Sequence, residues 1–138
     1  MNHASRAGAT AFFNSLLERV FVTAKGRYDF SSLFVEQALN ILGSNGVLGL
    51  VVPNRVFINK NAQITRTILT EHSELKVIVD FGSAKVFDAD AYVGCIIARK
   101  LGQTERARSL LRVIKVRSID SEFLTADLLE AQNADVGE

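Results

Sequence analysis

The stretch Gly46-Val47-Leu48-Gly49-Leu50-Val51-Val52-Pro53-Asn54 decides the fold of this chain. With Pro53 counted beside the five Val and Leu residues, six of these nine residues are apolar, and they do not alternate with polar residues. Such a run, rich in Val and closed by Pro, is typical of a strand that is buried on both faces in the middle of a parallel sheet. Pro53 cannot donate to a ladder, so we expect the strand to end there. Asn54 and Arg55 then lie at its carboxyl end, where open α/β sheets bind ligands.

The segments around this strand predict three helices. Apolar residues three and four positions apart predict helices over residues 9–24 and 31–42, and a third that runs from a cap at Asn59 or Asn61 to about His72. The buried side of the second helix is expected to consist of Phe34, Val35, Ala38, Leu39, Ile41 and Leu42.

Two further strands are predicted over residues 75–82 and 92–100, beside the first at about 46–52. Only nine or ten residues separate the second and third strands, whereas a parallel crossover needs a dozen or more. The third strand should therefore be antiparallel. A fourth strand could form over residues 111–117. The fold class is α/β, with helices on both faces of the sheet and one antiparallel strand.

Composition excludes several classes of protein. The 138 residues are 48% apolar and 22% charged, as in a globular domain, and the net charge of +1 gives no overall attraction to nucleic acid. The single Cys95 excludes an internal disulfide and a cysteine zinc site, and we predict no metal site. No stretch reaches the roughly 18 apolar residues of a membrane span. Residues 1–8 lack the apolar run of a secretory signal and are interpreted as a leader or cloning remnant, so a cytoplasmic location is expected.

Three motifs carry a family resemblance. They are Gly-Arg-Tyr-Asp-Phe-x-x-Leu-Phe at 26–34, Gly-Val-Leu-x-x-x-Val-Pro-Asn at 46–54, and Val-Asp-Phe-Gly at 79–82 followed by Lys-Val-Phe at 85–87. In order and spacing, residues 25–100 resemble the second half of the catalytic domain of N6-adenine DNA methyltransferases of the TaqI-like, restriction–modification type. The resemblance implies a partial Rossmann-like sheet, S-adenosylmethionine as cofactor and double-stranded DNA as partner.

The resemblance also shows what this chain lacks. In the family, the cofactor loop, an acidic ribose-binding residue and an Asn/Asp-Pro-Pro-Tyr/Phe motif lie in the first half of the domain. Pro53 is the only proline here, so the Pro-Pro pair is absent. We therefore expect a missing N-terminal half, and a chain that is inactive alone. The domains predicted are residues 9–102 as the C-terminal half of the catalytic domain, and 103–138 as a basic connector and terminal helix that lead toward a target-recognition region.

The resemblance assigns roles to four side chains. Phe34 would line the pocket for the cofactor's adenine, with Tyr28 and Asp29 beside it. Phe87 would stack on the target adenine once it is flipped out of the duplex, a contact worth about 1–3 kcal/mol. The alternatives are a core aromatic for Phe34, a helix-start carboxylate for Asp29, and a ring folded back onto the sheet for Phe87.

Basic and amide side chains are the candidate DNA contacts. Asn54, Arg55 and Lys85 lie beside the predicted site, and Arg106 and Arg108 belong to a basic segment over residues 99–117. That segment holds seven basic residues against Glu105. The alternatives are turn chemistry for Asn54 and a solvated charged face for the basic segment. For Arg66, a structural ion pair is favoured over a phosphate contact.

The sequence leaves three functions open. The first is a fragment of a site-specific DNA adenine-N6 methyltransferase of restriction–modification type. The second is a degenerate, non-catalytic module of the same superfamily that binds DNA or protein, and the third is a methyltransferase that acts on RNA or protein. In each case the edge of the strand at 46–52 would lack a neighbour, and a homodimer through this edge is expected.

Overall fold

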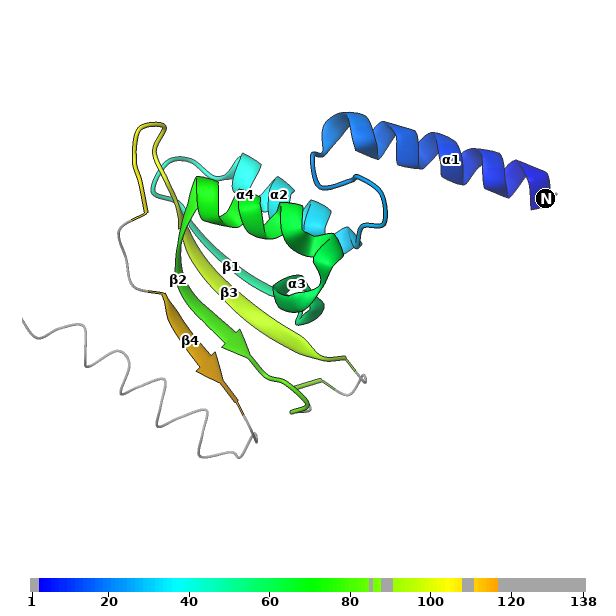
Figure 1. Ribbon diagram of the computed structural model, residues 1–138. Helices are drawn as coiled ribbons and strands as arrows, with labels where there is room; N and C mark the ends of the chain where they lie inside the picture. Colours follow the sequence, from blue (N-terminus) through cyan, green and yellow to red (C-terminus); the bar gives the residue numbers. More distant parts are fainter. Residues whose placement is uncertain (1–2, 85, 88–90, 108–110, 117–138) are drawn as a thin grey trace, which may run out of the picture.

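The computed structural model describes residues 3–84, 86–87, 91–107 and 111–116. A layer of two helices packs on a four-stranded sheet, and the first helix projects away from this body (Figure 1). The elements are α1 (His3–Val20), α2 (Phe30–Ile41), β1 (Val47–Pro53), α3 (Arg55–Ile58), the 3-10 helix η1 (Lys60–Ala62), α4 (Gln63–His72), β2 (Ser73–Asp80), β3 (Val93–Lys100) and β4 (Arg112–Lys115).

The order of the strands is β1-β3-β2-β4. Strand β3 is antiparallel to both β1 and β2, whereas β2 and β4 are parallel. Pro53 pairs with Val93, and Asp80 pairs with Gly94. The predicted strands and the antiparallel third strand are therefore confirmed, and so is the α/β class.

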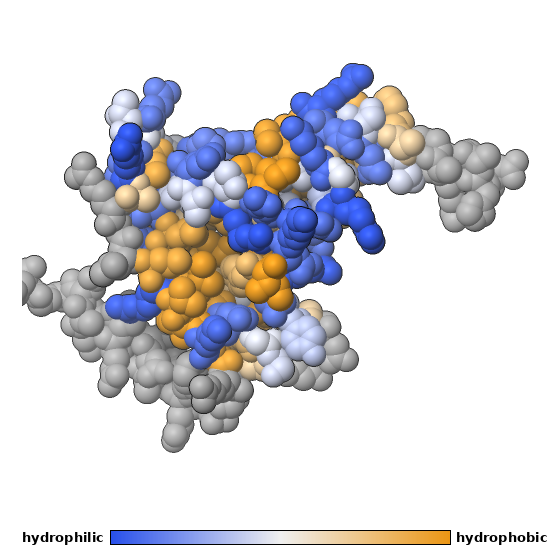
Figure 2. Space-filling view, in the orientation of Figure 1, coloured by the Kyte–Doolittle hydropathy of each residue, from blue (hydrophilic) through white to orange (hydrophobic). Residues whose placement is uncertain are grey.

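The core lies between the sheet and the α2–α4 layer. Its buried members come from β1, β3, α2, α3 and α4, namely Val35, Leu39, Leu48, Val52, Val56, Leu69, Ile96 and Ala98. Removing a side chain such as Ile96 from water contributes about 1.5–3 kcal/mol. Below α4, Figure 2 shows an apolar surface over the strands. A cavity of about 140 Å³ is lined by residues of α3, α4 and the sheet, among them Phe57 and Ile78.

The expectation that β1 is buried on both faces is wrong for the described residues. Leu48 and Val52 point into the core, but Val47 and Val51 are 65% and 54% exposed. The reason is that α2 and α4, the described helices that pack on the sheet, lie against each other on the same face. No described helix covers the other face of β1.

Helix α2 turns most of its predicted side to the core, since Val35 and Leu39 are buried and Ala38 and Leu42 pack against the core, but two predicted residues do not. Phe34 and Ile41 are 70% and 74% exposed. The buried side consists of Ser32, Leu33, Val35, Glu36 and Leu39. Glu36 is buried on this side because its carboxylate accepts hydrogen bonds from the linker that follows α1.

The ends of two other helices also differ from prediction. Helix α1 begins at His3 and ends at Val20, because the amides of Val22 and Thr23 donate to Glu36 rather than continue the helix. Neither predicted asparagine caps α4, since its N-cap is Ala62.

The chain between β1 and α4 forms α3 and η1, which were not predicted. Arg66 holds this segment. Its Nη1 donates to the carbonyls of Val56 at 2.8 Å and Asn59 at 2.9 Å. The carbonyl groups left at the end of the four-residue helix α3 thereby find a donor.

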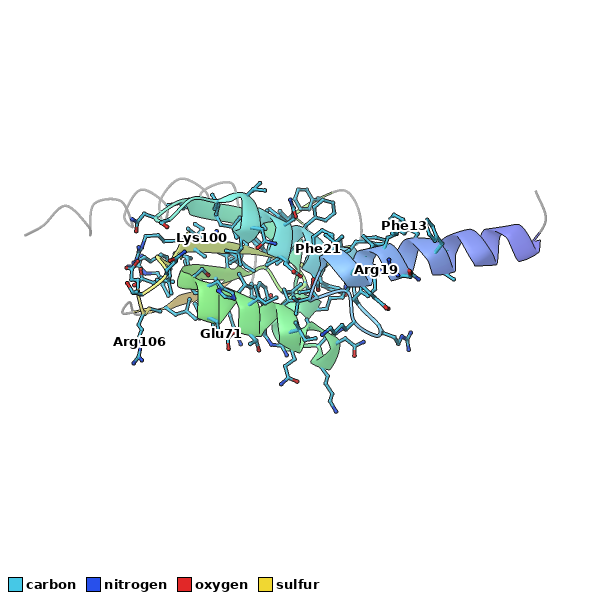
Figure 3. The ribbon with its side chains drawn as sticks, turned by 90° about the horizontal axis from the view of Figure 1, so that it is seen from above. Phe13, Arg19, Phe21, Glu71, Lys100 and Arg106 are labelled. Carbon is cyan, nitrogen blue, oxygen red and sulfur yellow. The ribbon has the colours of Figure 1, made fainter. Side chains whose placement is uncertain are left out.

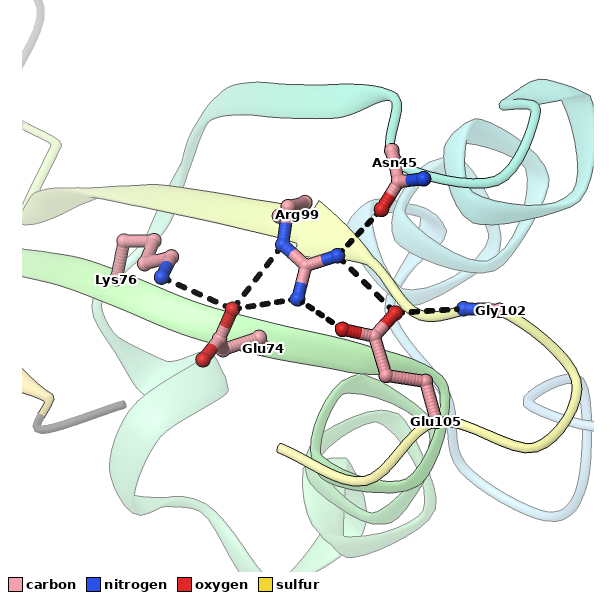
Figure 4. A network of polar contacts seen from close by, with 6 residues as sticks. All are labelled: Asn45, Glu74, Lys76, Arg99, Gly102 and Glu105. Carbon is pink, nitrogen blue, oxygen red and sulfur yellow. Dashed lines mark hydrogen bonds and ion pairs between the residues drawn. The ribbon is translucent and has the colours of Figure 1, made fainter. Parts of the chain in front are cut away.

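An ion-pair network closes the edge of the sheet where β1 and β2 begin (Figure 4). Arg99 donates to Glu74 at 2.8 Å and 3.1 Å, to Glu105 at 2.6 Å and 3.1 Å, and to Asn45 at 2.5 Å. Hydrogen bonds from Arg99 and from the Gly102 amide lower the pKa of Glu105. Lys76 also pairs with Glu74, at 2.9 Å.

Two strand glycines should respond differently to a methyl group. In Gly94→Ala the new Cβ would overlap the Phe57 ring and lie 2.6 Å from the Val79 carbonyl oxygen. We expect a loss of about 1–3 kcal/mol in the free energy of unfolding, measured by urea denaturation. Gly49→Ala is the control, because a Cβ there meets nothing within 4 Å. Equal stability of the two variants would show that β3 and α3 do not pack as described.

Candidate functional site

One edge of the sheet holds Asn54 and Arg55, two of the candidate DNA contacts, next to the connection that leads to Phe87. The amide of Asn54 donates to the Tyr92 carbonyl at 3.0 Å, and the amide of Phe81 donates to the Val93 carbonyl at 3.2 Å. The segment between β2 and β3 therefore leaves and re-enters the sheet beside the Pro53–Asn54 turn. This common edge is defined by Pro53, Asn54, Phe81 and Tyr92.

The common edge is hollowed. A depression of about 270 Å³ is lined by Pro53, Asn54, Arg55, Ala91, Tyr92 and Val93. Phe87 lies in the segment that joins β2 to β3, and its side chain is 49% exposed. An exposed aromatic ring on a polar connection has the chemistry to stack on a flat ligand.

An ion pair joins the start of α2 to the common edge. Asp29 caps α2 by accepting a hydrogen bond from the Ser31 amide at 2.9 Å, and its Oδ2 lies 2.8 Å from Nη2 of Arg55. Burial raises the pKa of Asp29, but the hydrogen bonds from Ser31 and the charge of Arg55 outweigh it, so the pKa lies below its ordinary value. The structure thus pairs a residue expected beside the cofactor with one expected to touch DNA.

The two aromatic candidates near α2 have different surroundings. The Tyr28 hydroxyl donates to Asn14 of α1 at 3.1 Å, and its ring meets Phe30 edge-on at a centroid distance of 6.2 Å. Phe34 is not part of the core, because it is 70% exposed. The reading of Phe34 as a core aromatic is therefore wrong, and its ring is free to meet another surface.

Two residues fix this region: the sequence did not single out Glu36, and it predicted a different contact for Arg66. Glu36 is 5% exposed and accepts hydrogen bonds from the Val22 amide and from the amide and hydroxyl of Thr23 at 2.6–2.9 Å, which anchors the linker after α1. Arg66 was expected in an ion pair, but it donates to backbone carbonyls near the common edge. A carboxylate inside the apolar spacing of α2 was the one available signal for Glu36.

Some residues of the basic segment make internal contacts, and others are exposed to solvent. Arg99 is held by Glu74 and Glu105, and Lys100 donates to the Leu39 and Leu42 carbonyls at the end of α2. Arg106 is exposed, but it follows the end of β3 and lies with Lys100 and Glu71 at the edge opposite the common edge (Figure 3). Lys85 and Arg108 lie outside the described residues.

The described part of the chain offers neither a metal site nor a membrane span. Within the described ranges, no three His, Cys, Asp or Glu side chains come together as metal ligands. No helix among those ranges has the length and apolar content to cross a bilayer. Burial raises the pKa of the half-buried Cys95 thiol, which makes it a poorer nucleophile.

Two comparisons with known proteins both find similarity to restriction-modification methylases. The family model described as Eco57I restriction-modification methylase matches residues 4–87. The type II restriction enzyme and methyltransferase RM.Eco57I of Escherichia coli is 28% identical over 82 residues, which are 59% of this chain. The chain spans only 8% of the length of that relative.

A solved structure has a similar fold. A protein of Listeria monocytogenes, described as a class I S-adenosylmethionine-dependent methyltransferase, aligns with a TM-score of 0.65 and 18% identity. The alignment covers 81% of this chain and 35% of the other.

The ion pair between Asp29 and Arg55 predicts a measurable change in the pKa of Asp29. The carboxyl pKa of Asp29, followed by carbon-13 NMR, should lie below the ordinary value of about 3.9 and rise in Arg55→Ala. Since the folded-state pKa is lowered, the stability contributed by Asp29 is present above about pH 3.9 and is lost as the pH falls through the folded-state pKa. Arg112→Ala, on β4, should leave the titration unchanged. A pKa that is the same in all three proteins would contradict the pairing.

Proposed function

The chain belongs to the Eco57I restriction-modification methylase family, and from this premise we propose that it is part of a DNA adenine-N6 methyltransferase that uses S-adenosylmethionine. The observation that carries the proposal is the common edge, where the Pro53–Asn54 turn meets the connection that bears Phe87. Enzymes that modify a base must take it out of the stack, and an exposed ring offsets part of that cost. We assign double-stranded DNA as substrate and the cytoplasm as the place of action.

The common edge would form one wall of the base pocket. Phe87 would lie against the face of the flipped adenine, while Asn54 supplies amide groups at the opposite rim. Arg55 is tied to Asp29, so its first role would be to hold the start of α2 against the turn after β1. These residues work by positioning the reacting groups rather than by proton transfer.

The described residues fit S-adenosylmethionine as one wall of its pocket. The ring of Phe34 offers an exposed flat face to a purine, and Tyr28 and Asp29 order the start of the same helix. When bound, the cofactor would supply the methyl group. The part of the domain that this chain lacks would supply the remaining walls, and we therefore propose that the chain is inactive alone.

The free edge of β1 marks where that missing half would join. The amide of Lys100 donates to the Gly46 carbonyl and the amide of Asn54 to the Tyr92 carbonyl, so even-numbered residues of β1 bond to β3. Antiparallel alternation then turns the backbone groups of Val47, Gly49 and Val51 away from β3. No described strand pairs with them. Gly49 leaves room for a close neighbour, since nothing inside the molecule lies within 4 Å of its Cβ position.

A methylation assay tests the proposed function. The protein from the complete coding sequence that contains these residues should form N6-methyladenine in duplex DNA, detected by mass spectrometry of digested nucleosides. Phe87→Ala should lower kcat/KM about 10- to 100-fold, because the flipped base loses about 1–3 kcal/mol of stacking, and Phe87→Tyr should restore most of it. Phe13→Ala, an exposed ring on α1, is the control. Formation of methylcytosine instead would refute the adenine assignment.

The 138-residue chain by itself should associate through β1. Sedimentation velocity at rising concentration should show dimers or larger species, since an apolar and uncharged strand edge is open. Val51→Lys should weaken association at least 10-fold by placing a charge beside that edge. Ile41→Lys, at a more exposed position on α2, should have no effect. Sedimentation of the unmodified chain as a monomer at high concentration would exclude this interface.

A further inference from the structure

A second hollow lies beside the common edge, on the side of the helices. It has a volume of about 480 Å³ and is lined by the linker between α1 and α2 and by the segment from η1 into α4. Figure 2 shows strongly hydrophilic side chains where these two segments meet. The residues that line it with charge are Lys25, Arg27 and Lys60, and no Asp or Glu lines it.

These three cations differ from most other described basic residues near the core. Arg55, Arg99 and Lys100 are each held by a carboxylate or by helix carbonyls. Lys25, Arg27 and Lys60 are exposed, and no ion pair or hydrogen bond to their side chains is found among the described residues. Three uncompensated positive charges around one hollow repel one another, so an anion that enters the hollow lowers the electrostatic energy.

The backbone keeps the three charges together. Gly26 has a φ of +66°, a left-handed conformation that suits glycine and turns the chain between Lys25 and Arg27. Lys60 comes from η1, which Arg66 tethers through the Asn59 carbonyl. The first turn of α4, which begins in the same hollow without a side-chain cap, adds the positive end of its dipole.

The hollow lies close to the site of methyl transfer in the proposed function. Arg27 is two residues before Asp29, which is paired with Arg55 at the common edge. Lys60 follows α3, which starts directly after the Pro53–Asn54 turn. A duplex whose base reached the common edge would carry its phosphates past this hollow.

We propose that the cleft formed by Lys25, Arg27 and Lys60 binds the phosphodiester backbone of duplex DNA next to the flipped base. The inference rests on the proposed function, which supplies the DNA. It assigns phosphate contact to residues on the helix side of the common edge, and it places the strongest electrostatic contact away from the exposed Arg106 at the other edge.

The test measures how binding of a duplex depends on salt. A fluorescein-labelled 20-base-pair DNA is titrated with the full 138-residue chain between 20 and 200 mM KCl, and fluorescence anisotropy is recorded. The variant Lys25→Gln/Arg27→Gln/Lys60→Gln should bind at least 10-fold more weakly at low salt. Its slope of log affinity against log salt should be smaller by about 2 to 3, because each phosphate contact contributes about 0.9. Circular dichroism confirms that each variant is folded.

A control variant separates the cleft from general charge. Arg19→Gln/Arg112→Gln/Lys115→Gln removes an equal number of positive charges at exposed positions on α1 and β4. The slope of log affinity against log salt should fall by less than 1 in this variant. Lys60→Arg keeps the charge and should keep the affinity. If the two triple variants lost equal affinity for the duplex, the proposed role of the cleft would be overturned, while DNA would remain the proposed substrate.

Two further outcomes are decisive. If the chain binds no duplex even at 20 mM KCl, the cleft is refuted, whereas the methyltransferase proposal is still judged by the methylation assay of the complete protein. If a single-stranded RNA of equal length displaces the duplex at equimolar concentration, the assignment to duplex DNA is overturned. The proposal is supported if the chain prefers the duplex to the RNA and if Lys25→Gln/Arg27→Gln/Lys60→Gln binds the duplex more weakly.

Discussion

The structure depends on the antiparallel insertion of β3 between β1 and β2. Because β3 runs against both neighbours, its first residues lie beside the last residues of each, with Val93 opposite Pro53 and Gly94 opposite Asp80. The turn after β1 and the connection after β2 are thereby brought to one edge. A parallel third strand would have sent that connection to the other end of the sheet and separated Phe87 from Asn54.

The chain secures this edge with side chains from outside the sheet. Asp29 reaches from the start of α2 to Arg55, and Arg66 reaches from α4 to the carbonyls after α3. At the opposite edge, Arg99 and Lys100 are held by internal contacts. Among the described residues near the common edge, the positive charges without an internal partner are those of Lys25, Arg27 and Lys60, which are the residues proposed to meet an anionic partner.

Much of the fold was predictable from the sequence because the decisive signals are local. The Val-rich run up to Pro53 predicts β1, and the short connection before β3 predicts its antiparallel direction. The same motifs predicted a restriction–modification methyltransferase, and the family match confirms that resemblance. The exposure of Val47, Val51 and Phe34 was not predictable, because apolar periodicity does not reveal which faces find a neighbour. Glu36 was missed, and Arg66 was expected in an ion pair, since most of their partners are backbone groups, which a sequence does not identify. The roles of Phe34 and Phe87 stay predictions.

The central claim is that a flipped base meets Phe87 at the common edge. Photo-crosslinking tests it most directly: 5-iodouracil replaces the target adenine in a duplex bound to the complete enzyme, and the attached peptide is identified by mass spectrometry. The account predicts that the crosslink falls on the connection between β2 and β3, with Phe87 as its main site. Crosslinks confined to residues 101–107, at the opposite edge of the sheet, would contradict it.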